Sequence, residues 1–105
     1  MSNVSFDQVI RSRRTTRAYR EEPVPEATLS ELVELATLAP TAMGLQPWRF
    51  SIITSRDVLK RVNEGVKQAC LAMIGHVPEM ERFRSAFEDP GYDIFYEAPA
   101  LVVIQ

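Results

Sequence analysis

Apolar residues recur at helical spacing in two long stretches of the chain and in one short one. The clearest pattern predicts a helix over residues 26–39, which Pro40 should end because the residue before a proline is biased away from helical angles. Residues 5–14 predict a shorter helix, in which Ser5 and Gln8 have the spacing of a capping box. The apolar positions of the helix predicted over residues 26–39 are Leu29, Leu32, Val33, Leu35, Ala36 and Ala39.

A third helix is predicted after Ser55, a suitable N-cap, with Asp57 in its first turn and Gly75 as its stop. Residues 80–88 suit a short helix, and the following "DPGYD" is a turn signal. The expected buried positions of the third helix are Leu59, Val62, Val66, Ala69, Cys70 and Met73. Cys70 is therefore interpreted as a small core residue.

Two segments have the pattern of strands. In "WRFSIIT" the residues Trp48, Phe50 and Ile52 alternate onto one side, and the final "APALVVIQ" is a continuous apolar run typical of a strand covered on both faces. Two strands are too few for an independent sheet with a proper core. We therefore expect a fragment of a larger domain, or a fold that another chain completes, and favour the fragment.

The charge distribution is uneven. The chain has 105 residues, enough for one domain, and 14 acidic against 12 basic residues give a net charge of -2. Five of the basic residues are arginines within "RSRRTTRAYR", residues 11–20, where no carboxylate occurs. This asymmetry indicates a local anionic partner, while the net charge of -2 argues against general nucleic-acid binding. No apolar run approaches the roughly 20 residues of a membrane helix, and cytoplasmic residence is the default expectation.

Three interpretations of the arginines are open from the residues alone. Arg13, Arg14 and Arg17 lie near a helix end beside two threonines, and guanidinium and hydroxyl groups together suit a single phosphate monoester. The same arginines could instead be a solvated face favoured by the helix dipole. A nucleic-acid patch is the third interpretation, which the acidic remainder of the chain disfavours.

The loop "APTAMGLQPWRF", residues 39–50, could approach a flat ligand. Gly44 permits close approach or a positive φ, and Gln46 offers a donor and an acceptor to a heterocycle. The structural alternative is that the prolines only set the path of the loop between two elements and that Trp48 belongs to the core. His76 is a lone histidine in neither a triad nor a metal site. A set of aromatic residues suits either core packing or a substrate pocket: Phe83, Phe87, Tyr92, Phe95 and Tyr96.

The order of these segments resembles the nitroreductase family of FMN-dependent oxidoreductases. The stretches that carry the resemblance are "RRTTRAY" (13–19), "PVP" (23–25), "APT" (39–41), "QPWRF" (46–50) and "EAPALVVI" (97–104). It implies an α+β nitroreductase-like fold, with helices around a mixed sheet, of which residues 1–105 would be the N-terminal portion. It also implies a homodimer with FMN at the interface. Ping-pong hydride transfer would run from NAD(P)H through the flavin to a nitroaromatic or quinone.

Carried over by position, the resemblance implies that Arg13, Arg14 and Thr15 hold the flavin phosphate, while Arg17 lies near the pyrimidine edge. Backbone groups of Thr41, Ala42 and Gly44 would contact the flavin ring. Gly44 stands where the family commonly has an asparagine, so that side-chain contact is lost. No catalytic acid, base or nucleophile and no metal ligand is expected.

Two alternatives remain open. One is a truncated, non-catalytic dimerisation or interaction module of the same fold. The other is a flavin-dependent dehalogenase or a flavin-fragmenting relative.

Overall fold

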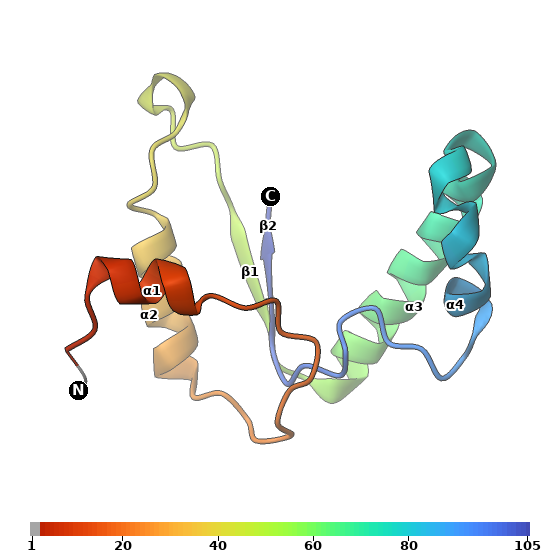
Figure 1. The fold of residues 1–105 in the computed structure, drawn as a ribbon, viewed down its shortest axis with the longest axis horizontal. Helices are drawn as coiled ribbons and strands as arrows, with labels where there is room; N and C mark the ends of the chain where they lie inside the picture. Colours follow the sequence, from red (N-terminus) through yellow and green to blue (C-terminus); the bar gives the residue numbers. More distant parts are fainter. Residues whose placement is uncertain (1–2) are drawn as a thin grey trace.

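Two short strands pair at the centre of the molecule, between helix α2 and the helices α3 and α4 (Figure 1). Strand β1 (Phe50–Ile53) runs antiparallel to β2 (Leu101–Ile104), with Phe50 opposite Ile104. Two further backbone hydrogen bonds, of 2.7 and 2.8 Å, join Arg49 to Gln105. The pairing fixes two segments side by side that lie far apart in the sequence. This computed structural model describes residues 3–105; Met1 and Ser2 of the expected domain lie outside the described residues.

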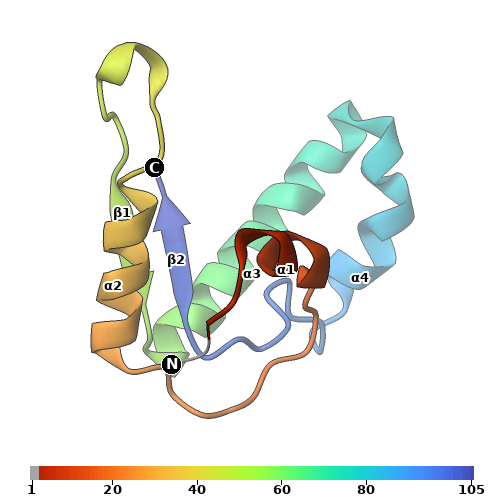
Figure 2. The ribbon, with the colours of Figure 1, turned by 60° about the vertical axis from the view of Figure 1, so that its left-hand side comes forward.

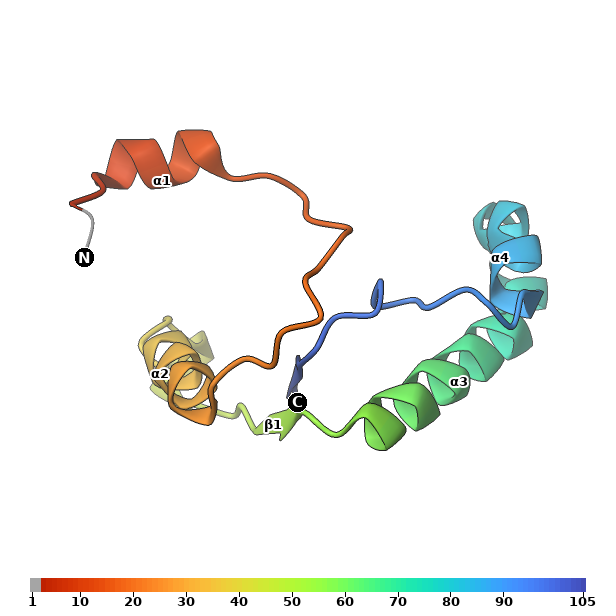
Figure 3. The same cartoon turned by 90° about the horizontal axis from the view of Figure 1, so that it is seen from below.

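Helix α1 (Phe6–Ser12) has the predicted capping box. The Gln8 N–H donates to Ser5 Oγ at 3.2 Å, and the Ser5 N–H donates to Gln8 Oε1 at 2.9 Å. None of its residues is buried, and Phe6 is 81% exposed. Figure 3 shows the helix standing apart from the others. Its apolar side therefore has no cover within residues 3–105.

Helix α2 (Glu26–Ala36) begins as predicted but ends before residue 39. The N–H groups of Leu38 and Ala39 bond three residues back, and Thr37 Oγ1 donates to the Glu34 carbonyl at 2.6 Å. With these bonds, residues 37–39 form tight turns in place of a last helical turn. Pro40 follows them, and its ring disfavours helical angles at the preceding residue. The predicted end at residue 39 was wrong. Only Leu29 of this helix is buried.

Helix α3 (Arg56–Met73) has the predicted Ser55 cap and continues as a 3₁₀ turn, η2 (Ile74–His76). A second 3₁₀ segment, η3 (Pro78–Phe83), and the short helix α4 (Arg84–Glu88) then fold back beside α3 (Figure 2). The predicted apolar stripe is only partly correct. Leu59 is buried, but Met73 is 52% exposed. Two polar residues on the helix, Asn63 and Lys67, are buried instead.

The strands are shorter than their patterns. Ile52 is 38% exposed while Ile53 is half-buried, so the predicted alternation of Trp48, Phe50 and Ile52 fails at its last member. Strand β2 is only half-buried, and within residues 3–105 it pairs with β1 alone. The expected cover on both faces of β2 is therefore not supplied by this stretch of chain.

The chain exposes more surface than a compact protein of its mass. Its accessible surface is 8815 Å², whereas the usual scaling for 11.9 kDa gives about 6,000 Å². The radius of gyration is 16.9 Å, against about 13 Å for a compact domain of this length. None of the helices within residues 3–105 has the length and apolar character that crossing a bilayer requires.

The small core makes one test of the fold direct. Ile74 is 2% exposed, so Ile74→Ala should lower the free energy of unfolding by about 2–4 kcal/mol through lost burial and a residual cavity. Leu38→Ala, at a position 77% exposed, should change it by less than about 0.5 kcal/mol. Urea denaturation followed by circular dichroism measures both. Equal effects of the two substitutions would contradict this packing.

Candidate functional site

The arginine-rich segment leaves α1 as extended chain. Arg13 caps the helix with φ −57° and ψ 134°, and residues 13–20 have no regular structure. Arg14 Nη1 donates to the carbonyl oxygens of Arg11 and Arg13 at 3.0 and 2.8 Å. Arg13, Arg14 and Arg17 are exposed, and none forms a salt bridge within residues 3–105. Their guanidinium groups remain largely available to an anion.

Arg11 differs from these three arginines. Its Nε lies 2.9 Å from Asp7 Oδ2, one turn earlier on the surface of α1. The pair is exposed, and such surface ion pairs contribute little to stability. The pair with Asp7 explains Arg11 as part of a solvated helix face. No such pair explains the arginines that are expected to bind phosphate.

The second predicted group lies in a tight turn, η1 (Ala42–Gly44). Met43, Gly44 and Gln46 all have left-handed angles, with φ of 56°, 65° and 47°. Thr41 Oγ1 accepts the Gln46 N–H at 3.0 Å and so holds the turn closed. A Cβ placed on Gly44 would meet nothing within 4 Å. Glycine suits this position because of its positive φ and not because another group crowds it.

Trp48 follows this turn and is half-buried against Phe50, with ring centroids 5.8 Å apart. This packing supports the core interpretation of Trp48. Its indole Nε1 is buried and has no hydrogen-bond acceptor within residues 3–105. A buried donor without an acceptor is costly, which indicates that this end of the molecule lacks a neighbouring group.

The two predicted groups do not meet within one chain. In Figure 1 the turn of residues 41–46 stands above α2, apart from the segment of residues 13–17, which leaves α1 toward the centre of the molecule. Thr15 is exposed beside the arginines, whereas in the distant turn Ala42 and Gly44 are exposed and Thr41 is half-buried. A ligand that used both groups would require a second surface to bring them together.

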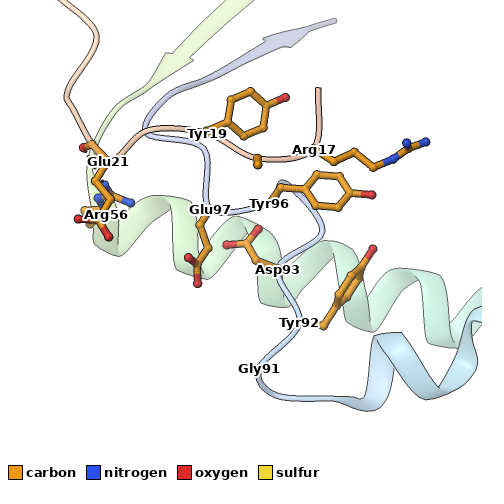
Figure 4. A pocket seen from close by; sticks show the side chains of 10 residues that line it. Arg17, Tyr19, Glu21, Arg56, Gly91, Tyr92, Asp93, Tyr96 and Glu97 are labelled. Carbon is orange, nitrogen blue, oxygen red and sulfur yellow. Dashed lines mark hydrogen bonds between the residues drawn. The ribbon is translucent and has the colours of Figure 1, made fainter. Parts of the chain in front are cut away.

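One predicted residue, Arg17, does line a cavity. This cavity, of about 370 Å³, lies between residues 17–21, the start of α3 and residues 91–97; we call it the Arg17 cavity (Figure 4). The first side contributes Arg17, Tyr19 and Glu21, and α3 contributes Arg56, whose Nη2 donates to the Glu21 carbonyl at 3.2 Å. The remaining side, residues 91–97, contributes Tyr92, Asp93, Tyr96 and Glu97.

Sequence reasoning found only part of this cavity. It singled out Tyr92 and Tyr96 as possible pocket residues, and both line it. It gave no pocket role to Tyr19, Glu21, Arg56, Asp93 or Glu97, because the segments that carry them are distant in the sequence. Phe83 and Phe87, from the same predicted aromatic set, instead pack on each other with ring centroids 6.3 Å apart.

The cavity is polar and carries both signs of charge. Arg56 lies beside Glu21 at one end of the cavity, whereas the side chain of Arg17 extends away from the carboxylates of Glu21, Asp93 and Glu97. Asp93 Oδ1 accepts the Phe95 N–H at 2.7 Å, which tightens the turn on that side. Burial raises the pKa of the Tyr92 phenol, and Tyr96 and Asp93 add to the rise. Within residues 3–105, no group of His, Cys, Asp and Glu side chains is arranged to hold a metal ion.

Comparison with known proteins defines the class. Residues 10–105 match the model of the nitroreductase family, so the chain belongs to that family. It is 51% identical over 52 residues to an NADH dehydrogenase of Thermus thermophilus, covering 50% of this chain and 25% of the relative. It is 34% identical over 70 residues to a 4-nitrobenzoate reductase of Pseudomonas putida, covering 67% and 27%.

Solved structures agree with the family. The chain superposes on a Bacteroides fragilis nitroreductase with bound FMN at a TM-score of 0.81 and 25% identity, covering 97% of this chain and 52% of that one. The expected α+β nitroreductase-like fold, incomplete in this stretch, is confirmed. The chain thus spans about half of that solved structure and about a quarter of these curated relatives.

The Tyr92 environment has a measurable consequence. Because the raised pKa favours the neutral phenol in the folded state, its contribution to stability is complete below the ordinary value of 10.0 and is lost as the pH rises through the folded-state pKa. Absorbance titration at 295 nm, with the Tyr92→Phe curve subtracted from the wild-type curve, should give a midpoint above 10.0. A midpoint at or below that value would contradict this environment.

Proposed function

We propose that the protein containing this chain is an FMN-dependent oxidoreductase that takes electrons from NAD(P)H and passes them to a small acceptor such as a nitroaromatic or a quinone. The observation that carries the proposal is the set of exposed arginines without acidic partners, Arg13, Arg14 and Arg17, in a member of the nitroreductase family. The FMN in the Bacteroides fragilis structure supports the choice of cofactor.

The donors present suit this cofactor. Forked guanidinium groups of Arg13 and Arg14 and the hydroxyl of Thr15 match the oxygens of a phosphate monoester. Arg17, at the mouth of the Arg17 cavity, would place positive charge beside the pyrimidine edge of the flavin. Within residues 3–105 the Gly44 N–H already donates to the Thr41 carbonyl at 3.0 Å, whereas the Thr41 N–H has no acceptor, so this turn offers the Thr41 N–H as a backbone donor to a ring. When bound, FMN would supply the two-electron transfer, while these residues position it.

A second copy of the chain is the natural source of the missing surface. Within one chain, the turn of residues 41–46 and the segment of residues 13–17 stand apart (Figures 1 and 3). A homodimer could bring the turn of one subunit to the arginines of the other. The large exposed surface and the uncovered apolar side of α1 support such an association.

The same openness supports a second candidate, an interaction module of this fold that has no activity of its own. The uncovered strands and the missing asparagine at Gly44 favour it. An absorbance spectrum separates the two. A purified protein that is colourless and remains so with added FMN would exclude the oxidoreductase, and a bound flavin that NAD(P)H bleaches would exclude the inactive module.

Paired substitutions test the phosphate site. Arg13→Ala with Arg14→Ala should raise the Kd for FMN more than tenfold, because each charge-assisted hydrogen bond contributes about 1.5–3 kcal/mol. Arg11→Ala with Arg20→Ala removes the same charge and should change it less than about twofold, since Arg11 is held by Asp7. Quenching of FMN fluorescence measures both. Equal losses would indicate a diffuse charged surface in place of a site.

Gly44 offers a gain-of-affinity test. Its backbone has φ 65°, which asparagine tolerates better than other residues, and the space around its Cβ position is open. Gly44→Asn should therefore fold and strengthen FMN binding severalfold by restoring an amide to the turn. Gly44→Ala, which adds a Cβ without the amide, serves as the control and should not strengthen it. Equal affinities of the two variants for FMN would show that this turn makes no side-chain contact with the flavin ring.

A further inference from the structure

A buried lysine holds one side of the Arg17 cavity in place. Lys67 is 2% exposed, at a position on α3 that would suit an apolar residue. Its Nζ donates to the carbonyl oxygens of Asp89 and Tyr92 at 2.7 and 2.8 Å. The nearest carboxylate, Glu64, lies 3.8 Å away and is mostly exposed. The ammonium group is therefore satisfied mainly by the backbone of a loop.

Asn63 lies one turn earlier on the same face of α3 and contacts the same loop. Its Oδ1 accepts the Ile94 N–H at 2.8 Å, and its Nδ2 reaches the Tyr92 carbonyl at 3.5 Å. Both side chains are buried, and their four contacts all go to residues 89–94. Because hydrogen bonds are directional, two neighbouring side chains fix both the position and the orientation of this backbone.

The loop that they hold is otherwise weakly structured. Residues 89–97, which we call the wall segment, contain only turns, closed by short bonds such as Gly91 N–H to Asp89 Oδ1 at 2.8 Å. Tyr96 and Glu97 both have φ of 56°, an unfavourable angle for residues with a Cβ. Such angles persist only where the surrounding structure determines them, and the hydrogen bonds from α3 fix the part of the segment just before them, residues 89–94.

The wall segment provides half of the residues around the Arg17 cavity (Figure 4). We infer that Lys67, together with Asn63, is a positioning residue that holds the wall segment in the shape that lines this cavity and so determines which acceptors fit beside the flavin. The last part rests on the proposed function, because it takes Arg17 as a flavin neighbour. The part concerning the wall segment stands on the contacts alone.

Lys67→Met tests the inference, since methionine keeps an unbranched apolar side chain and removes the ammonium group. Lys60→Met is the matched control, the same change at an exposed position of α3. Amide hydrogen exchange at Ile94 should accelerate at least tenfold in Lys67→Met relative to the control, while the Arg49 amide, which donates to the Gln105 carbonyl at 2.7 Å beside β1, changes less than twofold. Ile94 is informative because its own acceptor, Asn63, is untouched.

Exchange at Ile94 equal to that of the control, or an equal acceleration throughout the chain, would overturn the inference. Should Lys67→Met not fold, Asn63 supplies the test. Asn63→Ala should release Ile94, and Asn63→Asp, which keeps an acceptor, should retain protection to within threefold of wild type. Absence of this rescue would also overturn the inference.

The flavin-loaded protein tests the acceptor part. Lys67→Met should raise the KM for an acceptor such as 4-nitrobenzoate at least fivefold, with kcat and the Kd for FMN changed less than twofold. An unchanged KM would overturn the role of the wall segment in acceptor fit. If the wild-type protein takes up no FMN, the proposed function fails, and exchange at Ile94 still decides whether Lys67 holds the wall segment.

Discussion

The antiparallel pairing of β1 with β2 is the interaction on which the rest of the structure depends. After α3 and α4, strand β2 brings the chain back beside β1, the strand that follows the proline loop. With the strands joined, the residues before β2 must run beside α3 and face residues 17–21. The Arg17 cavity is thus a product of strand register, since the three segments that line it are distant in the sequence.

The sequence predicted elements well where a local signal was complete and poorly where tertiary contacts decided. The Ser5 capping box and the Ser55 cap were correct, because each cap is a bond between neighbours. The end of α2 was misplaced by three residues, since turns begin before the proline acts. The family was recognisable from two motifs. The buried pair Asn63 and Lys67 was not, because polar residues on a helix ordinarily face water and their acceptors lie on a distant loop.

The candidate site shows the same division. Motifs indicated which residues could bind a flavin, and the structure leaves Arg13, Arg14 and Arg17 without acidic partners. No motif could show that the arginines and the turn of residues 41–46 would lie apart. The unpartnered Trp48 indole and the excess exposed surface both reflect how little apolar area this stretch of chain buries.

The two-stranded sheet has a consequence for handling the chain alone. Within residues 3–105, each strand has one paired edge and one open edge, and β2 has the apolar sequence "LVVI". No proline or charged side chain interrupts either strand, and these are the usual devices that prevent strands of different molecules from pairing. At high concentration, the backbone donors and acceptors on these open edges would pair with strands of other molecules. The same four-residue strand that organises the fold would therefore also promote aggregation.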